Sequence, residues 1–292
     1  MIFTIENDVI RVSVETKGAQ LKSVFSKETG VEYLWQGDAK YWTGRAYNLF
    51  PFVGRFADGK YVVEGKEYAM DRHGFARGSE FEMVEQTESS LVFEIRESEQ
   101  TLAIYPFKFV FTVKFEIVGK KLIVTYGVKN TGDNTMYFGL GGHPGFNVPF
   151  DGGEFEDYYV EFACEGSPTQ VIANEKGLMT AERKVLSLEN GKIIRLEHNL
   201  FDNDAIIMQD VCKTVYVRGK NTSRSIKVSY PEMEYLGLWH MPKTDAPYLC
   251  VEPWMTLPSS DGAPEVFETK EHIGVVEKNK TFETHFDIEI IE

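Results

Sequence analysis

Apolar and polar residues alternate one by one through much of this 292-residue chain. In residues 10–15, for example, Ile10, Val12 and Val14 are each followed by a polar residue. Successive side chains of a β-strand point to opposite faces, so such a segment buries one face and exposes the other. The same alternation occurs in residues 91–95, 109–117, 122–128, 226–230 and 286–290. The pattern predicts many antiparallel strands, and the scarcity of helical periodicity favours a sandwich or a barrel.

Turn residues separate the predicted strands. Gly65 and Gly119 lie where β-hairpins would reverse direction, and the clearest candidate for a helical turn is residues 38–42. The chain contains no Gly/Ser-rich linker, low-complexity tract or convincing internal repeat. We therefore expect an all-β fold with few short helices, built as a single domain over residues 1–292.

The charge of the chain narrows the classes of partner. It carries 31 basic and 45 acidic side chains, for a formal net charge of −14. Such a surface repels nucleic-acid phosphates and anionic lipid, so we expect neither nucleic acid nor membrane as a partner. The same charge argues weakly against an anionic substrate and favours a neutral small molecule. A monomer or a homodimer is expected.

Cysteine usage and the N-terminal sequence bear on compartment and cofactors. Cys164, Cys212 and Cys250 are widely spaced and odd in number, which predicts neither a disulfide framework nor a zinc site. Three separate thiols suit a reducing cytoplasm. The N-terminus has no basic segment followed by an apolar stretch, and no apolar run is long enough for a membrane span. We expect a cytoplasmic protein without a metal or an organic cofactor.

Four segments interrupt the alternation and combine glycine or proline with aromatic and reactive polar residues. They are residues 48–58 (NLFPFVGRFAD), 71–77 (DRHGFAR), 139–149 (GLGGHPGFNVP) and 248–254 (YLCVEPW). Departures from local rules in an otherwise regular β protein tend to mark functional surfaces. These segments are therefore the candidate site.

Two side chains in these segments suit acid–base chemistry. His143 lies between Gly-Gly and Pro-Gly, where its own segment offers no bulky neighbour to cover it, and imidazole titrates near neutral pH. Glu252 follows an apolar run, where burial would raise its pKa and strengthen it as a base. The structural alternatives are a histidine that holds a turn and a glutamate that pairs with an arginine.

Four further residues are candidates for binding a substrate. Arg55 offers several fixed hydrogen-bond donors, with an ion pair to Asp58 or Asp71 as its structural alternative. His73 adjoins a glycine and a phenylalanine, and Trp254 offers a flat apolar face to a sugar ring. Asp204 would accept hydrogen bonds from hydroxyls or cap a turn.

Together the four segments resemble the aldose 1-epimerase (galactose mutarotase-like) family, particularly its bacterial branch. They match, in order, the patterns N-x-F-P-x-x-G-R, H-G-F-A-R, G-G-H-P-x-F-N and C-x-E-P-W, between Asn48 and Trp254. The resemblance implies a large antiparallel supersandwich with an open cleft on one face. It also implies a cofactor-free enzyme that interconverts the α and β anomers of a hexose.

The resemblance also implies roles for individual residues. His143 matches the family's general acid and Glu252 its general base, while Arg55 and His73 match the residues that orient the substrate around the ring oxygen. Asp204 looks like the family's sugar-binding carboxylate. On this interpretation Glu252 removes the proton from O1 and a charged or strongly donating His143 protonates O5. The charge of Arg55 would help to keep Glu252 ionised.

Two other functions remain open at this level. A sugar-binding or regulatory protein would keep the pocket without turnover, since fold alone does not determine function. A mutarotase for hexose 6-phosphates would need clustered basic residues, and Arg45, Arg55, Arg72 and Arg77 lie near the motifs. A glycosidase is disfavoured, because it needs two carboxylates and the prominent pair here is histidine with glutamate.

Overall fold

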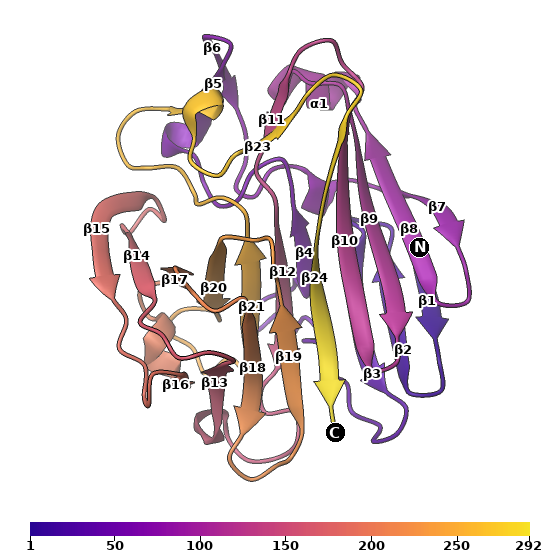
Figure 1. Cartoon of the computed structure of the whole chain (residues 1–292), viewed down its shortest axis with the longest axis vertical. Coiled ribbons are helices and arrows are strands. Elements are labelled where there is room, and N and C mark those ends of the chain that lie inside the picture. Colours follow the sequence, from indigo (N-terminus) through magenta and orange to yellow (C-terminus); the bar gives the residue numbers. More distant parts are fainter.

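Two large antiparallel sheets form the body of the protein (Figure 1), as a computed structural model that describes residues 1–292 shows. The nine-stranded sheet has the order β16 (Ile193–Arg195), β13 (Tyr158–Phe162), β18 (Thr214–Gly219), β19 (Ser225–Ser229), β24 (Thr281–Ile291), β10 (Lys121–Asn130), β9 (Phe109–Val118), β8 (Ser90–Arg96) and β7 (Glu82–Gln86). The seven-stranded sheet has the order β15 (Met179–Val185), β14 (Thr169–Ala173), β17 (Ile206–Gln209), β20 (Tyr235–Trp239), β21 (Tyr248–Trp254), β12 (Gly141–Asn147) and β4 (Ala46–Leu49). The predicted all-β sandwich is confirmed.

Three small sheets complete the architecture. The N-terminal sheet consists of β1 (Ile2–Glu6), β2 (Ile10–Glu15) and β3 (Gln20–Ser26), and β3 lies beside β4. A second contains β22 (Glu265–Val266), β5 (Lys60–Val63) and β6 (Lys66–Ala69), and a third pairs β11 (Met136–Phe138) with β23 (Gly274–Val276). Glu64 and Gly65 both have positive φ in the tight turn from β5 to β6, as the predicted hairpin requires.

The alternation of the sequence builds the interior between the large sheets. The six segments in which apolar and polar residues alternate all lie in strands, namely β2, β8, β9, β10, β19 and β24 with the turn after β19. Their buried residues belong to one apolar cluster of 64 side chains that runs from Ile5 to Ile290. Phe50 stacks on Phe111 in this interior, with ring centroids 4.4 Å apart.

A buried tyrosine hydroxyl connects the two large sheets through Asn48 and the Gly141 carbonyl. The hydroxyl of Tyr126, on β10, donates to Oδ1 of Asn48, on β4, at 2.9 Å. The amide nitrogen of Asn48 donates to the carbonyls of Gly18 and Ala19. Asn48 therefore has partners on both sides although it is 3% exposed.

Helices are few and short. The α-helix α1 (Glu99–Ile104) begins at Ser98, whose side chain accepts from the Thr101 amide while the Thr101 hydroxyl accepts from the Ser98 amide. Residues 38–42 form a hydrogen-bonded turn rather than a helix, because the amides of Tyr41 and Trp42 both donate to the Asp38 carbonyl. None of the helices has the length and apolar character needed to cross a membrane.

Two of the four segments that interrupt the alternation contain strands of the seven-stranded sheet. Residues 141–147 form β12 and residues 248–254 form β21, side by side in the seven-stranded sheet. Nearly every residue of both strands is buried. A strand that is covered on both faces has no polar face, so it loses the alternation by which strands were predicted.

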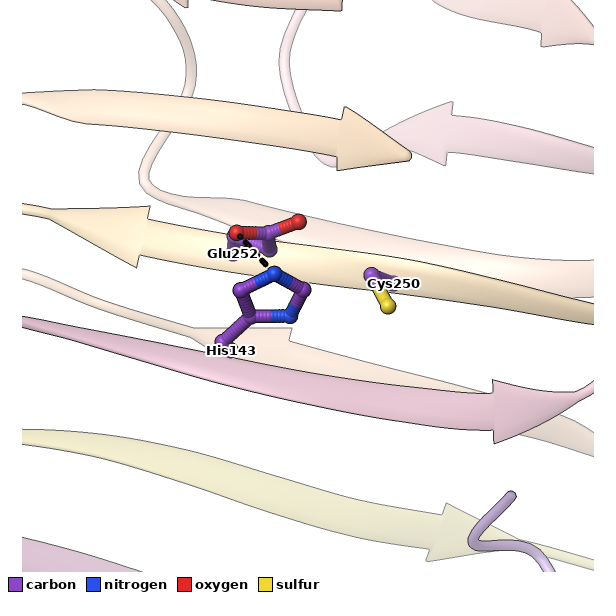
Figure 2. Close-up of side chains that lie close together, drawn as sticks. All are labelled: His143, Cys250 and Glu252. Carbon is purple, nitrogen blue, oxygen red and sulfur yellow. Dashed lines mark ion pairs between the residues drawn. The ribbon is translucent and has the colours of Figure 1, made fainter. Parts of the chain in front are cut away.

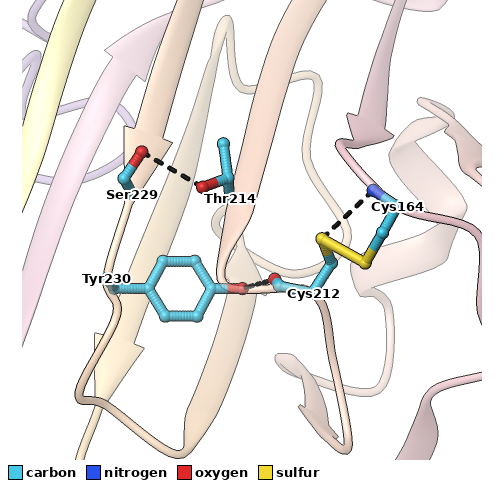
Figure 3. The surroundings of a disulfide bond; sticks show 5 residues. All are labelled: Cys164, Cys212, Thr214, Ser229 and Tyr230. Atoms are coloured by element: carbon cyan, nitrogen blue, oxygen red, sulfur yellow. Dashed lines mark hydrogen bonds between the residues drawn. A yellow bond between two sulfur atoms is a disulfide. The ribbon is translucent and has the colours of Figure 1, made fainter.

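The prediction of three separate thiols is wrong for two of them. Cys164 follows β13 and Cys212 precedes β18, and these strands pair antiparallel, so the two cysteines lie at the same end of the pair. Their Cα atoms are 5.9 Å apart and their sulfur atoms are bonded (Figure 3). The Tyr230 hydroxyl donates to the Cys212 carbonyl beside them. Cys250 is a free thiol, and it is buried.

Candidate active site

A cavity of about 350 Å³ lies on the outer face of the seven-stranded sheet. Its lining includes all six residues singled out from the sequence, which are Arg55, His73, His143, Asp204, Glu252 and Trp254. The period of the strands explains how they meet. On β21 Glu252 and Trp254 point into the cavity. Val251 points to the opposite face and packs in the large apolar cluster between the sheets. Residues 200 positions apart in the sequence thus share one cavity.

The register of β12 and β21 sets His143 against Glu252. Gly141 pairs with Trp254 and Gly145 with Cys250, so the position directly opposite Glu252 is His143. The two side chains meet with 3.3 Å between His143 Nε2 and Glu252 Oε2 (Figure 2). Gly237 on β20 is the partner of Glu252 on its other side and has no side chain to cover the carboxyl group.

Burial moves both members of this pair toward their neutral forms. Desolvation raises the pKa of Glu252 well above its usual range, and the nearby Asp204 carboxylate raises it further. Desolvation lowers the pKa of His143 to about 3. Burial therefore favours the form of the pair in which the proton is on Glu252 and His143 is neutral. The roles of a charged or strongly donating His143 and of Glu252 as the base stay predictions.

Two neighbouring groups, on Trp254 and Arg72, favour the ionised form of Glu252. The Trp254 N–H group, which is near Glu252 but does not form a well-aligned hydrogen bond with it, and the charge of Arg72 both lower the pKa of this carboxyl group, against the larger effect of burial. The charge of Arg72 thus acts in the direction expected of Arg55, whose own role stays a prediction.

Three buried polar atoms at the centre of the site have no hydrogen-bond partner. They are His143 Nδ1, Glu252 Oε2 and Trp254 Nε1. Buried polar atoms are almost always hydrogen-bonded in native proteins, and unsatisfied ones concentrate at functional sites. Their grouping here provides one N–H donor and two groups that exchange protons, all available to a ligand that carries hydroxyl groups.

His73 is held in one tautomer by the backbone beside it. The Gly54 amide donates to His73 Nδ1 at 3.1 Å, and the His73 amide donates to the Gly54 carbonyl at 2.7 Å. The proton of the neutral ring is therefore on Nε2. Burial is the main cause of a pKa of His73 well below the usual range, and electrostatic interaction with His143 and with three arginines lowers it further. His73 has a positive φ of 66°, and a methyl group at the following Gly74 would clash with the Phe50 carbonyl at 2.2 Å.

The remaining predicted residues differ in their surroundings. Arg55 makes no ion pair with Asp58 or Asp71, so the structural alternative for this residue is not realised. Asp204 accepts a hydrogen bond from the Ala205 amide and also lines the cavity. Trp254 is 4% exposed, because Leu49, Ile207 and other apolar residues pack around it. Stacking of a sugar on Trp254 stays a prediction.

Aromatic residues that the sequence did not single out form one wall of the cavity. Trp42 stacks on the His143 imidazole at 4.9 Å between ring centroids, and Trp239 meets the same ring edge-on at 5.7 Å. Tyr47 also lines the cavity. Trp42 lies in the turn over residues 38–42, and nothing in the local sequence indicates that this turn folds over His143. Only tertiary structure brings it there.

His143, Cys250 and Glu252 are the one group of side chains here with a geometry that suits a metal ion. Their ligand atoms lie within 4.8 Å of one another. A metal needs the thiolate and the carboxylate, whereas burial raises the pKa of both Cys250 and Glu252 well above their usual ranges. The set is therefore poorly matched to a metal, and the absence of one stays a prediction.

Comparison with known proteins gives a consistent result. A family model described as aldose 1-epimerase matches residues 1–258. The plasmid-encoded protein LacX of Lactococcus lactis subsp. lactis is 31% identical over the full length of both chains. A galactose mutarotase related enzyme from Lactobacillus acidophilus is 32% identical, with a TM-score of 0.94 over 100% of this chain and 98% of that one. A galactose mutarotase-like protein from Lactobacillus casei is 27% identical, with a TM-score of 0.93 over the whole of both chains.

Proposed function

The chain belongs to the aldose 1-epimerase family, and from this premise we propose that it is a mutarotase that interconverts the α and β anomers of a hexose. The observation that carries the proposal is the direct contact of His143 with Glu252 at the floor of the cavity. A site that only binds sugar has no need of two proton-exchanging groups side by side. Both are buried, and each has an unsatisfied polar atom.

The reaction needs two proton transfers at neighbouring oxygen atoms. Glu252 accepts the proton of the C1 hydroxyl while His143 gives a proton to the ring oxygen O5, so that the C1–O5 bond breaks and C1 becomes an aldehyde. O1 and O5 are both bonded to C1, so two groups in contact with each other, as His143 and Glu252 are, can reach both oxygens. After rotation about the C1–C2 bond, the two transfers run in reverse and close the ring on the other face.

Substrate binding prepares the pair for this reaction. Burial favours the form of the pair in which the proton is on Glu252 and His143 is neutral. A sugar hydroxyl that donates to Glu252 stabilises its carboxylate form, as do Arg72 and the N–H group of Trp254. The proton then moves to His143, which becomes the acid. His73, with its proton on Nε2, and Arg55 donate to the ring oxygen side and orient the sugar.

Activity measurements on two variants test these roles. Glu252→Gln and His143→Asn should each lower turnover by roughly 10²- to 10⁴-fold, the usual contribution of a general acid or base. Polarimetry on freshly dissolved α-glucose and α-galactose measures the rate. Glu88→Gln is the matched control, since Glu88 is an exposed carboxylate in the turn between β7 and β8. Turnover near that of the unmodified protein in Glu252→Gln would reject Glu252 as the base.

The rival function is a carbohydrate-binding or regulatory protein without turnover. Calorimetric titration with the same sugars separates the two. Sugar binding together with mutarotation no faster than the uncatalysed reaction would favour the rival.

A further inference from the structure

We propose that the cavity is built for an aldose that carries a phosphate group on its terminal carbon, and that Arg55, Arg72 and Arg77 bind this group. The inference rests on the proposed mutarotase function and specifies its substrate class. It reverses the expectation of a neutral substrate that the overall charge of the chain suggested.

The three arginines of the cavity lack the carboxylate partners that several other arginines of the protein have. Arg55, Arg72 and Arg77 all line the cavity, and none of their guanidinium groups makes a hydrogen bond or an ion pair. The Arg77 guanidinium makes a cation–π contact instead, 5.6 Å from the centroid of the Tyr47 ring. By contrast, four arginines elsewhere each pair with a carboxylate, namely Arg96, Arg195, Arg218 and Arg224.

The fourth arginine near the motifs is excluded by its position. Arg45 is not part of the cavity lining, and its Nη1 donates to the Lys22 carbonyl and to Gln36 Oε1, each at 2.7 Å. Its hydrogen bonds hold the loop before β4. The structure thus separates one arginine with a structural role from three that are free to bind a ligand.

The charge of the cavity is positive although the protein as a whole carries −14. Three arginines line the cavity against two acidic residues, Asp204 and Glu252, and burial raises the pKa of Glu252 well above its usual range. Burial is the main cause of a lowered pKa of Arg72, and the charges of Arg55 and Arg77 lower it further while Asp204 and Glu252 oppose them, so the three positive charges act on one another. A dianionic phosphate would relieve this repulsion, and guanidinium groups bind phosphate oxygens through paired hydrogen bonds. Surface charges more than about 10 Å away are largely screened at 0.1 M salt.

The chemistry of mutarotation decides where the phosphate can be. A phosphate on O1 would block the hydroxyl group that must lose its proton, so the anionic group lies elsewhere on the sugar. The terminal carbon of a hexopyranose is bonded to C5, which also carries the ring oxygen. A terminal phosphate therefore lies on the ring-oxygen side, which is the side assigned to His73 and Arg55. The His73 ring is 5.7 Å from that of His143, and Arg72 is its neighbour in sequence, so the arginines adjoin the reacting groups.

The experiment compares anomer exchange for matched sugars. Magnetisation-transfer NMR at equilibrium would measure kcat/KM for glucose, galactose, their 6-phosphates and glucuronate. We expect kcat/KM for a 6-phosphate to exceed that for the parent hexose by at least about tenfold. Arg72→Gln should lower kcat/KM for the 6-phosphate by about 10- to 100-fold, the usual effect of losing a hydrogen bond to a charged group, and should reduce the preference for phosphate. Arg11→Gln removes the same charge from the exposed surface and should keep the preference.

Each outcome has one meaning. Exchange of the neutral hexoses as fast as that of their 6-phosphates would overturn this inference and leave the mutarotase function standing. Equal rates for glucuronate and the 6-phosphate would overturn phosphate as the recognised group. If no sugar of the panel exchanges faster than without protein, the proposed function itself fails, and this inference fails with it. A preference for phosphate that survives in Arg72→Gln would remove Arg72 from the phosphate-binding set.

Discussion

At the scale of single residues, the site is defined by two buried groups whose ordinary charges are suppressed. Glu252 is 1% exposed and His143 8% exposed, and neither has the hydrogen bonds that normally accompany such burial. An arrangement of this kind favours function at the expense of folding stability. The free energy of unfolding should therefore reveal both groups through its dependence on pH.

Replacement of Glu252 should stabilise the protein increasingly as the pH rises. The pKa of this carboxyl group is raised in the folded state above its ordinary value of 4.5. The folded protein therefore holds the proton that the unfolded chain has lost, and stability declines from about pH 4.5 upward through the folded pKa. Glu252→Gln has no such titration, so its advantage should grow with pH. Urea unfolding from pH 5 to pH 8 measures it, with Glu88→Gln as control. An advantage that shrinks with rising pH would contradict the assignment.

His143 should limit stability on the acid side. Its pKa is about 3 in the folded state against 6.5 ordinarily, so the unfolded chain binds a proton first as the pH falls. Stability is then lost progressively from pH 6.5 down to pH 3, by up to about 4 kcal/mol. His143→Asn should show a shallower acid decline in urea or thermal unfolding. His272→Asn, at an exposed histidine, should follow the unmodified protein. Parallel acid profiles for both variants would show that His143 is not the group responsible.

The identities of the candidate site residues could be predicted from the sequence, but the shifts of their pKa values could not. Glycine and proline around His143, and the apolar run before Glu252, are local signals that the sequence displays. The pKa of each group depends on the atoms packed around it, above all on residues distant in sequence such as Trp42 and Asp204. For that reason the effect of Arg72 on Glu252 was not predicted from the sequence.

At the scale of elements, the glycines of the central strands make room for the chemistry. Gly141, Gly145 and Gly237 lie beside Trp254, Cys250 and Glu252 on neighbouring strands. Gly142 faces the interior instead, where a methyl group would meet Phe286 at 2.8 Å. The alternation of a strand therefore gives neighbouring glycines two different functions.

Two alanine substitutions should separate these functions. In Gly237→Ala the new methyl group lies 3.1 Å from the Trp254 ring and 3.4 Å from Glu252 Cβ. We expect kcat/KM to fall about tenfold or more through displacement of the reacting groups, with a stability loss of about 1 kcal/mol. Gly142→Ala should instead lose about 1–3 kcal/mol through overpacking of the interior. Polarimetry and urea unfolding on both proteins test the contrast. A larger loss of activity in Gly142→Ala would contradict it.

Strands with one solvent-exposed face were predictable from the sequence. On β9 and β10 the alternation of burial follows the alternation of the sequence. On β12 and β21 both faces are covered, so periodicity gave no sign of a strand, although composition marked the same residues as functional. Cys164 and Cys212 were missed for a related reason, since their proximity follows from the pairing of β13 with β18 and not from their spacing.

At the scale of the whole molecule, two sheets share one apolar interior, and polar contacts across it are rare. The hydrogen bond from Tyr126 to Asn48 is such a contact, and it lies beneath the strand that carries Tyr47 at the cavity. It couples the nine-stranded sheet to the edge of the sheet that carries the site.

Removal of this hydrogen bond should cost stability without reorganising the fold. Tyr126→Phe leaves the buried Asn48 Oδ1 without its donor, which typically costs about 1–3 kcal/mol. Urea unfolding should show a lower midpoint with an unchanged slope, because the surface exposed on unfolding stays the same. Tyr216→Phe, on a half-exposed tyrosine without a hydroxyl partner, should change stability by less than about 0.5 kcal/mol. Equal stability of the two variants would deny the contact between the sheets any energetic role.

The alternation of β21 also restricts how this protein can change. Only every second residue of the strand reaches the cavity, so the insertion or deletion of a single residue there would exchange Glu252 for an apolar neighbour and turn its carboxyl group toward the interior. An insertion or deletion within the strand must therefore involve an even number of residues to keep Glu252 in the cavity. A change of sugar specificity, in evolution or by design, is therefore expected to come from side-chain substitutions and from changes in the loops around the cavity.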